Sequence, residues 1–421
     1  MRVCVVGLGK IGLPLAAQYA SKGLSVVGSD PDAGLVSDVG RGRCPVVGEK
    51  GLALSIRKAV AAGRLEATTD TAAAVREAQV VVVIVPVGLS PDRRPDFSRL
   101  DEAAAAVARG LTPGTLVILE TTVPVGTTRR RLGPVLEASG LRMGAGFQLA
   151  YSPERVSVGQ IFADLKRYPK IVGGVDDASR DAAVAFYGRA LEARVIAVRD
   201  AETAEFVKLA ETTYRDVNIA LANELAVYAD RHGLDSAEAF AAANSQPYSH
   251  LHQPGVGVGG HCIPVNPYLL MAEGPSLRLP ALAREVNDSM AAYGVGKLEE
   301  ALGGLRGRKV LILGLAYRPN VREAADSSTF ALARGLEARG ARALVHDPLF
   351  SAREVEAAGL RPAEPFPPPD VDALVIQALH DQYRGLDLGA FAGCRVVLDG
   401  RNALSRAEVE ARGMLYLGIG R

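Results

Sequence analysis

Cys262 has the surroundings of a nucleophilic residue. It follows a glycine-rich run, residues 254–260, which holds four glycines in seven positions. Glycine lets a backbone approach a ligand closely, so Gly257 and Gly259 are candidate substrate contacts. If a helix begins at Cys262, its N-terminus lowers the pKa of the thiol. The pattern predicts either a nucleophilic thiol beneath a substrate loop or a buried structural cysteine beside a mobile loop.

A second group of candidates lies on a long helical stretch. Lys208, Thr212 and Arg215 fall within one narrow sector of a helix that turns about 100° per residue. A single helix lysine is ordinarily solvated, but Lys208 shares its sector with two other polar residues. Elsewhere, Glu154 follows Pro153 at a predicted strand end and is a candidate general acid or base.

The N-terminus carries the pattern of a dinucleotide site. Gly7, Gly9 and Gly12 form G-x-G-x-x-G between an apolar strand, residues 3–6, and a helical pattern, residues 13–21. These glycines allow a tight turn and a close approach of pyrophosphate to the helix N-terminus. Strand, glycines and helix in this order predict dinucleotide binding.

An acidic residue stands where the ribose of such a ligand would lie. Asp30 ends the second predicted strand, and no arginine follows it directly, so NAD is predicted in preference to NADP. Two further apolar strands are predicted at residues 80–86 and 116–119. Thr122, just beyond the latter, faces the reacting atoms or simply ends the strand; the sequence supports both interpretations.

Composition excludes several classes of protein. Lys and Arg number 48 against 47 Asp and Glu, which leaves no excess charge to favour nucleic acid or an anionic membrane. The four cysteines have no CxxC or metal-ligand spacing, which indicates free thiols in a reducing compartment. No apolar run approaches the roughly 20 residues of a membrane span, and the chain starts on a strand rather than a signal segment. We expect a cytoplasmic protein with no metal.

The alternation of strands and helices predicts an α/β fold of two Rossmann-like doubly wound lobes, joined by a long central helix and a helical segment. The predicted domains are an NAD-binding domain (1–198), a central helical and dimerisation domain with Cys262 (199–298), and a C-terminal α/β domain (299–421) suited to a second, phosphorylated ligand. Residues 151–155 and 170–174 are predicted as edge strands of the first lobe.

The central helix is predicted from residue 201 to about 232, stopped by Gly233. Apolar residues at three- and four-residue intervals predict a buried stripe along it, suited to a homodimer seam. The predicted stripe consists of Phe206, Ala210, Thr213, Val217, Leu221, Leu225 and Tyr228.

A third segment repeats the α/β pattern after Gly294-Val295-Gly296. Its predicted elements are strands at 309–314, 343–347, 372–376 and 395–399 and a helix at 329–339. Arg318 and Arg401 follow strand ends of this lobe, where a guanidinium suits a phosphorylated ligand.

Over essentially its whole length the chain resembles the UDP-glucose/GDP-mannose dehydrogenase family. Two of its motifs, RDVNIALANE and GGHCIPV, most resemble the subgroup that acts on UDP-N-acetylhexosamines. The motifs that carry the resemblance are GLGKIGLP, ETTVPVGTT, YSPERVSVGQ, AEFVKLAETTYRDVNIALANE, PGVGVGGHCIPV and GLAYRPN.

The resemblance implies oxidation of sugar C6 from alcohol to carboxylate with two NAD⁺. Cys262 would trap the aldehyde as a thiohemiacetal, which is oxidised to a thioester and hydrolysed. Lys208 would stabilise the oxyanion, and Thr122 and Glu154 would handle water and proton transfer. The implied cofactor residues are Gly7, Gly9, Ile11, Gly12, Asp30, Pro86 and Thr122. The implied substrate residues are Glu154, Arg155, Lys208, Arg215, Tyr248, Gly257, Gly259, Arg318 and Arg401.

Three positions depart from the family pattern. Thr212 stands where the family usually has Asn, and Asn266 stands where it usually has an Asp that assists the chemistry. The usual VPTP is Val85-Pro86-Val87-Gly88 here. Asn266 cannot act as a base, so two alternatives stay open: a two-electron dehydrogenase that stops early, and a nucleotide-sugar-binding pseudoenzyme.

Overall fold

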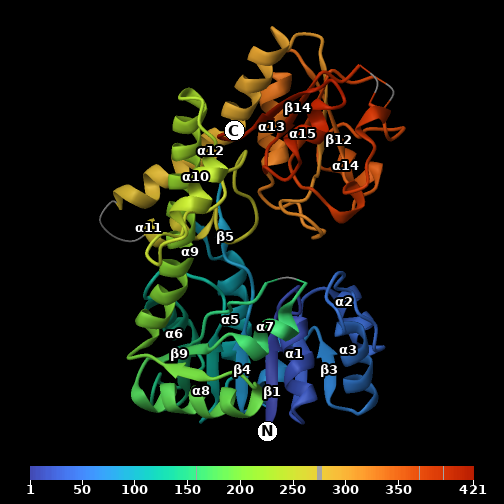
Figure 1. The fold of residues 1–421 in the computed structure, drawn as a ribbon. Helices are drawn as coiled ribbons and strands as arrows, with labels where there is room; N and C mark the ends of the chain where they lie inside the picture. The colour runs from blue at the N-terminus through green and yellow to red at the C-terminus, as the bar shows by residue number, and fades with distance from the viewer. Residues whose placement is uncertain (158, 273–276, 369, 392) are drawn as a thin grey trace. The chain divides into compact units, whose positions relative to one another are not determined.

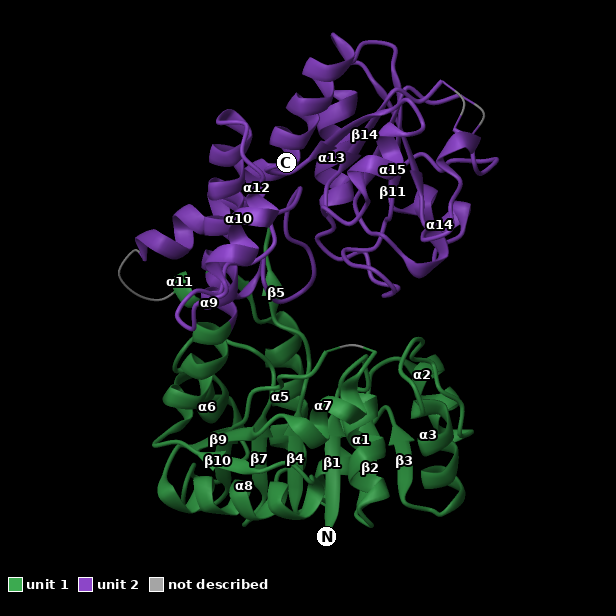
Figure 2. Cartoon of the chain, in the orientation of Figure 1, with its two compact units in different colours: residues 1–211, 268–275 green, residues 212–267, 276–421 purple. Residues whose placement is uncertain are grey.

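The computed structural model describes residues 1–157, 159–272, 277–368, 370–391 and 393–421. It divides into two compact units, coloured separately in Figure 2. Unit 1 comprises residues 1–211 and 268–275, and unit 2 comprises residues 212–267 and 276–421.

Unit 1 is built on an eight-stranded sheet in the order β10-β9-β8-β7-β4-β1-β2-β3 (Figure 1). Six neighbouring strands of this sheet, β8, β7, β4, β1, β2 and β3, are parallel in the order of a dinucleotide-binding fold. Strand β9 pairs with β8 antiparallel. The strands are β1 (Arg2–Val6), β2 (Ser25–Ser29), β3 (Leu65–Thr68), β4 (Val80–Val83), β7 (Leu116–Leu119), β8 (Gln148–Tyr151), β9 (Lys170–Gly174) and β10 (Val195–Ala197). A separate hairpin pairs β5 (Gly88–Leu89) with β6 (Pro95–Asp96).

The prediction that residues 151–155 and 170–174 form edge strands was wrong. Strands β8 and β9 lie inside the sheet, and β8 ends at Tyr151, so that Ser152 to Arg155 follow it. The edge next to β9 is β10, whose short sequence gave no signal.

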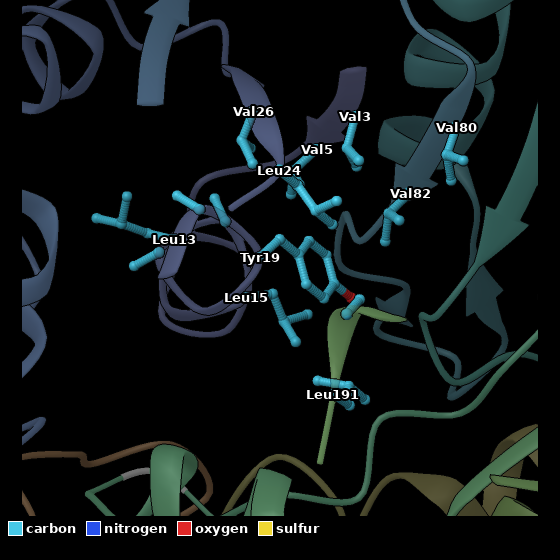
Figure 3. Close-up of a cluster of buried hydrophobic side chains, with 14 of the residues drawn as sticks. Val3, Val5, Leu13, Leu15, Tyr19, Leu24, Val26, Val80, Val82 and Leu191 are labelled. Carbon is cyan, nitrogen blue, oxygen red and sulfur yellow. The ribbon is translucent and has the colours of Figure 1, made fainter. Parts of the chain in front are cut away.

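Helices cover both faces of this sheet. They are α1 (Gly12–Ser21), α2 (Ala33–Gly40), α3 (Leu52–Ala61), α4 (Thr71–Arg76), α5 (Ser98–Gly110), α6 (Gly133–Glu137), α7 (Ile161–Arg167) and α8 (Asp177–Ala190), with a π-helical turn η1 (Thr128–Leu132) before α6. The apolar face of α1 packs on β-branched residues of β1, β2 and β4 in the hydrophobic core (Figure 3). Tyr19 lies in this core with a fully buried ring, so its hydroxyl needs a buried acceptor.

Helix α9 (Ala201–Arg231) is continuous, and the division between the units falls within it. It ends at Gly233, which has φ +64°, as predicted. The prediction of a buried apolar stripe was wrong for the single chain. Phe206, Leu221 and Tyr228 are 51%, 45% and 58% exposed.

Apart from Leu209, the buried face of α9 instead consists of polar and small residues. Alanines alternate there with buried polar residues, because the face packs closely on other segments. The buried polar residues are Glu205, Lys208, Thr212, Thr213, Asp216 and Asn223.

Unit 2 holds a five-stranded sheet, all parallel, in the order β12-β11-β13-β14-β15. Two apolar clusters pack on its two faces. The strands are β11 (Lys309–Leu313), β12 (Arg342–His346), β13 (Ala373–Ile376), β14 (Val396–Asp399) and β15 (Leu415–Gly418). Its helices are α10 (Ser236–Ala243), α12 (Arg278–Leu302), α13 (Ser328–Glu337), α14 (Ala352–Ala357) and α15 (Arg406–Glu410), with short 3₁₀ turns η2 (Asp381–Tyr383) and η3 (Leu388–Ala390). Helix α11 (Asn266–Met271) begins in unit 2, and from residue 268 on it belongs to unit 1.

The glycines at 294 and 296, which precede the third segment of the sequence, do not interrupt a helix. Both lie inside α12. A Cβ on Gly294 would lie 3.0 Å from Val256 and 3.2 Å from Leu398, so this glycine permits close packing of the helix. The doubly wound α/β architecture with two Rossmann-like lobes and a long central helix is confirmed.

Candidate functional site

The carboxyl ends of four parallel strands form one edge of the unit 1 sheet. Val6 pairs with Ser29 and with Val83, and Val83 pairs with Leu119, so β2, β1, β4 and β7 end in register. Residues that follow these strands therefore gather at the edge where doubly wound sheets bind ligands. The predicted cofactor residues all follow these four strands.

The three glycines of the fingerprint differ in what surrounds them. Gly7 has φ +99°, and a Cβ on Gly12 would lie only 1.8 Å from the Gly7 carbonyl oxygen, so the turn itself requires both. Gly9 has no atom within 4 Å of the place where a Cβ would stand. The protein leaves that space open, as the approach of a pyrophosphate requires.

Asp30 is fixed by the glycine turn. Its Oδ2 accepts a hydrogen bond from the Leu8 N–H at 2.9 Å, and its Oδ1 accepts from the Asp32 N–H at 3.0 Å. The side chain remains partly exposed and can accept from ribose hydroxyls. These residues fit NAD.

The other predicted cofactor residues occupy the same edge. Ile11 packs partly buried on the core below the turn. Pro86 is exposed in the loop after β4, and Thr122 is half-buried in the loop after β7. The neighbouring Thr121 hydroxyl donates to the Val85 carbonyl oxygen at 2.6 Å and ties the two loops together.

Behind this edge lies a buried cluster of charge. Lys170 Nζ is 2.8 Å from Glu120 Oε2 and 3.0 Å from Glu154 Oε2. Tyr19 and Tyr187 donate their hydroxyls to Glu120 Oε1 at 3.2 Å and 2.6 Å. Burial raises the pKa of Glu120 to about 7, although Lys170 opposes the shift.

Glu154 is the member of this cluster nearest to solvent. Its side chain is 11% exposed, against 5% for Lys170 and 0% for Glu120. Its Oε1 accepts from the N–H groups of Arg155 and Val156 at 2.6 Å and 3.1 Å. Burial acts to raise the pKa of Glu154, but the effect of Lys170 is larger and the pKa is lowered, so this carboxylate is held ionised.

Lys208 lies one turn along α9 from a buried carboxylate, Glu205. That carboxylate accepts from the Thr128 N–H at 2.8 Å, from the Thr128 hydroxyl at 2.6 Å and from the Gly126 N–H, so it anchors the loop that carries Thr122. Lys208 itself is buried, and its Nζ lies 3.6 Å from Glu211 Oε1. Arg155, a predicted substrate residue, donates to the same Glu211 at 2.9 Å.

Cys262 lies in unit 2 and is exposed, whereas the other three cysteines are buried or partly buried. The expectation that a helix begins at Cys262 was wrong, since α11 begins four residues later at Asn266. The Cys262 carbonyl oxygen accepts from the Asn266 N–H at 2.9 Å, so the thiol residue leads directly into the first turn. The buried Asn266 amide donates to the Thr212 hydroxyl oxygen at 3.2 Å.

The glycine-rich run 254–260 owes its composition to packing within unit 2. A Cβ on Gly257 would lie 2.8 Å from Ser328 Oγ, and one on Gly259 would lie 2.7 Å from Asp326 O and from Tyr317 Cβ. The run therefore lies against the segment that follows β11. This packing accounts for the glycines without a ligand.

Arg401 clamps the same run to the sheet. Its Nη1 donates to the Gly257 carbonyl oxygen at 3.0 Å, its Nε to the Gln377 carbonyl oxygen at 2.8 Å, and its Nη2 to Gln377 Oε1 at 2.6 Å. Burial lowers the pKa of Arg401 to about 10. Its described contacts are all with the protein, and they position the glycine-rich run.

The remaining predicted substrate residues are more open. Arg318 is half-buried and donates to the Tyr317 hydroxyl oxygen at 3.0 Å. Arg215 is exposed on α9, and Tyr248 is 92% exposed. Among the described residues, no group of three or more acidic, histidine or cysteine side chains is placed to hold a metal ion.

Lys170 and Glu205 were not predicted from the sequence as site residues, and no role was predicted for Glu120. Glu120 directly follows a fully apolar strand, and a charged residue at that place was the available signal. Lys170 begins an apolar strand, where a solvated lysine is the ordinary expectation. Only the fold brings the two together.

A doubly wound sheet with an open glycine turn and a partly exposed carboxylate defines a dinucleotide-binding α/β protein. Comparison with known proteins carries the assignment further. Three models of the UDP-glucose/GDP-mannose dehydrogenase family match: the NAD binding domain over residues 1–191, the central domain over 202–289 and the UDP binding domain over 311–406.

Relatives match over the full length. A UDP-N-acetyl-D-mannosamine dehydrogenase of Pyrococcus horikoshii is 34% identical, over 100% of this chain and 99% of the relative. The solved structure of UDP-D-ManNAc dehydrogenase from that organism superimposes with a TM-score of 0.91 at 33% identity, covering 100% of this chain and 99% of that one. An NDP-N-acetyl-D-galactosaminuronic acid dehydrogenase of Ralstonia solanacearum is 33% identical, over 97% of each chain.

The chain belongs to the UDP-glucose/GDP-mannose dehydrogenase family, and the predicted resemblance is confirmed. It is an NAD-dependent oxidoreductase of the nucleotide-sugar dehydrogenase type, with NAD as its cofactor. Within the part of the chain that the structure describes, none of the helices combines the length and apolar character that crossing a membrane requires.

Proposed function

We propose that the chain oxidises the C6 alcohol of a UDP-N-acetylhexosamine to the uronate, with a covalent intermediate on Cys262. The exposure of Cys262 is the observation that carries this proposal. Burial raises the pKa of Cys4 to about 12 and that of Cys394 to about 11, and it also raises the pKa of the partly buried Cys44. A nucleophilic thiol must be reachable and able to ionise, and Cys262 is the exposed cysteine of the four.

The residues take the following roles. NAD⁺, held by the glycine turn and Asp30, supplies the hydride acceptor for each of two oxidations. Lys208 stabilises negative charge on the sugar oxygen. Cys262 attacks the C6 aldehyde, retains it as a thiohemiacetal and becomes the leaving group when water attacks the resulting thioester.

Glu154 serves as the base in this scheme. Asn266 has no titratable group and donates its amide to Thr212. The ionised carboxylate of Glu154 then takes the proton from the sugar hydroxyl or from the hydrolytic water.

The substrate class rests on the relatives, which are named for UDP-N-acetyl-D-mannosamine and for an N-acetyl-D-galactosaminuronic acid. Incubation of the protein with NAD⁺ and UDP-ManNAc, UDP-GalNAc, UDP-GlcNAc or UDP-glucose tests it. We expect two NADH and one uronate per sugar with at least one UDP-N-acetylhexosamine. Absence of NADH with every nucleotide sugar would contradict the proposal.

A second candidate is a two-electron dehydrogenase that releases the aldehyde. Asn266 favours it, because the usual carboxylate at that position is missing. The same experiment separates the candidates, since the second predicts one NADH per sugar and an aldehyde that a hydrazide reagent traps.

We further propose a homodimer built on α9. Phe206, Leu221, Leu225 and Tyr228 stand exposed on this helix and would be covered by a second copy. We retain the division into an NAD-binding domain (1–198), a central dimerisation domain (199–298) and a nucleotide-sugar domain (299–421), which the three matched family segments support. Free thiols throughout support a reducing, cytoplasmic setting.

A further inference from the structure

The proposed reaction releases protons as well as hydrides. In balanced form it is RCH₂OH + 2 NAD⁺ + H₂O → RCOO⁻ + 2 NADH + 3 H⁺, so three protons must leave the site in each turnover. A single carboxylate can hold one of them at a time. The groups in contact with Glu154 therefore decide how it recovers its charge.

We propose that Glu120 receives, through Lys170, the proton that Glu154 takes from the reacting hydroxyl or water. This inference rests on the proposed role of Glu154 in the preceding subsection. It assigns to Lys170 and Glu120 a part in proton transfer, at positions that do not touch the substrate.

Lys170 is within hydrogen-bond distance of both carboxyl groups, and the side chains of Glu120 and Glu154 also contact each other. Glu154 Oε1 is held by two backbone N–H groups, so Oε2 is the oxygen that faces Lys170, at 3.0 Å. On the other side, Glu120 Oε1 accepts from Tyr19 and Tyr187, so Oε2 faces Lys170 at 2.8 Å. Each carboxylate therefore presents one oxygen to the same ammonium.

The transfer is balanced. An O–H bond of the ligand breaks, and the proton forms a new O–H bond on Glu154. Lys170 then gives one of its three ammonium protons to Glu120 Oε2 and takes the new proton from Glu154. Glu154 is again a carboxylate, Lys170 is again an ammonium, and Glu120 has become a carboxylic acid.

The surroundings favour this direction. The titratable groups around Glu120 are Lys170 from β9, Tyr19 from α1, Tyr187 from α8, Tyr151 from β8 and Glu154 after β8. The Lys170 ammonium also lies 5.0 Å from the centre of the Tyr187 ring. Because burial raises the pKa of Glu120 to about 7 while that of Glu154 is lowered, the proton moves to the group that holds it more tightly.

Two substitutions distinguish proton transfer through Lys170 and Glu120 from a role in which these residues only balance charge. Glu120→Gln keeps an acceptor for Tyr187 but cannot take up a proton. Lys170→Arg keeps a cation between the two carboxylates but cannot release a proton, because arginine stays charged. Glu192→Gln is the matched control, because Glu192 pairs with Lys22 and Lys166 at the surface of unit 1.

We expect both variants to lower kcat by about tenfold or more, with KM for NAD⁺ and for the sugar little changed. In the wild type, kcat should fall as the pH drops below about 7, because Glu120 is then already protonated and cannot accept. Glu120→Gln should remove this inflection, while Glu192→Gln should retain it. An unchanged kcat and pH profile in Glu120→Gln, or full activity in Lys170→Arg, would overturn the relay.

An infrared measurement tests whether Glu120 takes up a proton, and it does not require turnover. Difference spectra between acidic and alkaline pH should contain protonated-carboxyl bands from Glu120 and from Glu205, because burial raises the pKa of each to about 7. Glu120→Gln should remove the Glu120 band, and Glu192→Gln should keep it. If this band is present but the wild type reduces no NAD⁺, the proposed function fails and the proton-accepting Glu120 stands. If turnover is normal but the band and the inflection survive in Glu120→Gln, the relay fails and the proposed function stands.

Discussion

At the scale of single residues, two glycines of the glycine turn have different roles, one in folding and the other in binding. Gly9 and Gly12 belong to one motif, yet the space around them differs. A Cβ on Gly12 would overlap the Gly7 carbonyl oxygen, whereas one on Gly9 would enter open space. The two positions therefore serve different purposes, and parallel substitutions can show it.

Gly9→Ala should fold with a melting temperature close to that of the wild type and should bind NAD⁺ more weakly, because the added methyl group occupies the space for pyrophosphate. Gly12→Ala should lower the melting temperature, since the backbone must shift. Thermal unfolding and NAD⁺ titration of both variants check this. Equal loss of stability in the two would contradict the distinction.

Asp30 gives a second prediction at this scale. Its carboxylate accepts from the glycine turn and remains partly exposed, so a 2′-phosphate would be repelled. Asp30→Ala should narrow the ratio of kcat/KM between NAD⁺ and NADP⁺ without abolishing activity. Comparable kcat/KM for both cofactors in the wild type would refute the assignment.

At this scale, the sequence predicts the features that residues close together in the chain specify. The glycine turn and Asp30 are specified by a strand, a helix and a short spacing, so they were predictable. Glu120 and Lys170 are 50 residues apart and meet because β7, β8 and β9 are neighbours in the sheet. No pattern of neighbouring residues predicts that these two side chains are in contact.

At the scale of elements, the glycine-rich run before Cys262 is held by buried polar bonds. The Gly255 N–H donates to Asn223 Oδ1 on α9 at 2.9 Å, and Asn223 donates to Asn287 Oδ1 on α12 at 2.8 Å. Together with the Arg401 clamp, these bonds fix the run that leads to the thiol. Its glycines reflect packing, which the sequence pattern alone did not distinguish from ligand contact.

Arg401→Met should therefore act on the run rather than on the cofactor. Loss of the guanidinium leaves the Gly257 and Gln377 oxygens without their donor, and we expect a destabilisation of roughly 1.5–3 kcal/mol. KM for the nucleotide sugar should rise while the Kd for NAD⁺ stays constant. Arg406→Met removes an exposed arginine of the same lobe and is the control. An unchanged sugar KM in Arg401→Met would count against the clamp.

At the scale of the whole molecule, α9 buries mainly small and polar residues and exposes several large apolar ones. Its length and its stop at Gly233 were predictable from the sequence, because periodicity and a helix-ending glycine are local signals. Which face of α9 is buried could not be predicted from the sequence, because apolar residues pack equally well against a partner subunit and against the core of the same chain. The exposed stripe makes assembly directly testable.

Leu221→Glu should convert the dimer to a monomer that still folds and binds NAD⁺, because Leu221 is 45% exposed in the single chain. Leu54→Glu on α3 is the matched control, with 54% exposure on a different helix. Sedimentation velocity should show monomer for the first variant and dimer for the second. A wild-type monomer at micromolar concentration would refute the dimer.

The count of NADH formed per sugar in Cys262→Ser tests the central claim most directly. With a UDP-N-acetylhexosamine that the wild type oxidises fully, the wild type and the control Cys44→Ser should each form two NADH. Cys262→Ser should form at most one and release aldehyde, because a serine hydroxyl ionises far less readily than a thiol. Two NADH per sugar at the wild-type rate in Cys262→Ser would remove the cysteine from the reaction.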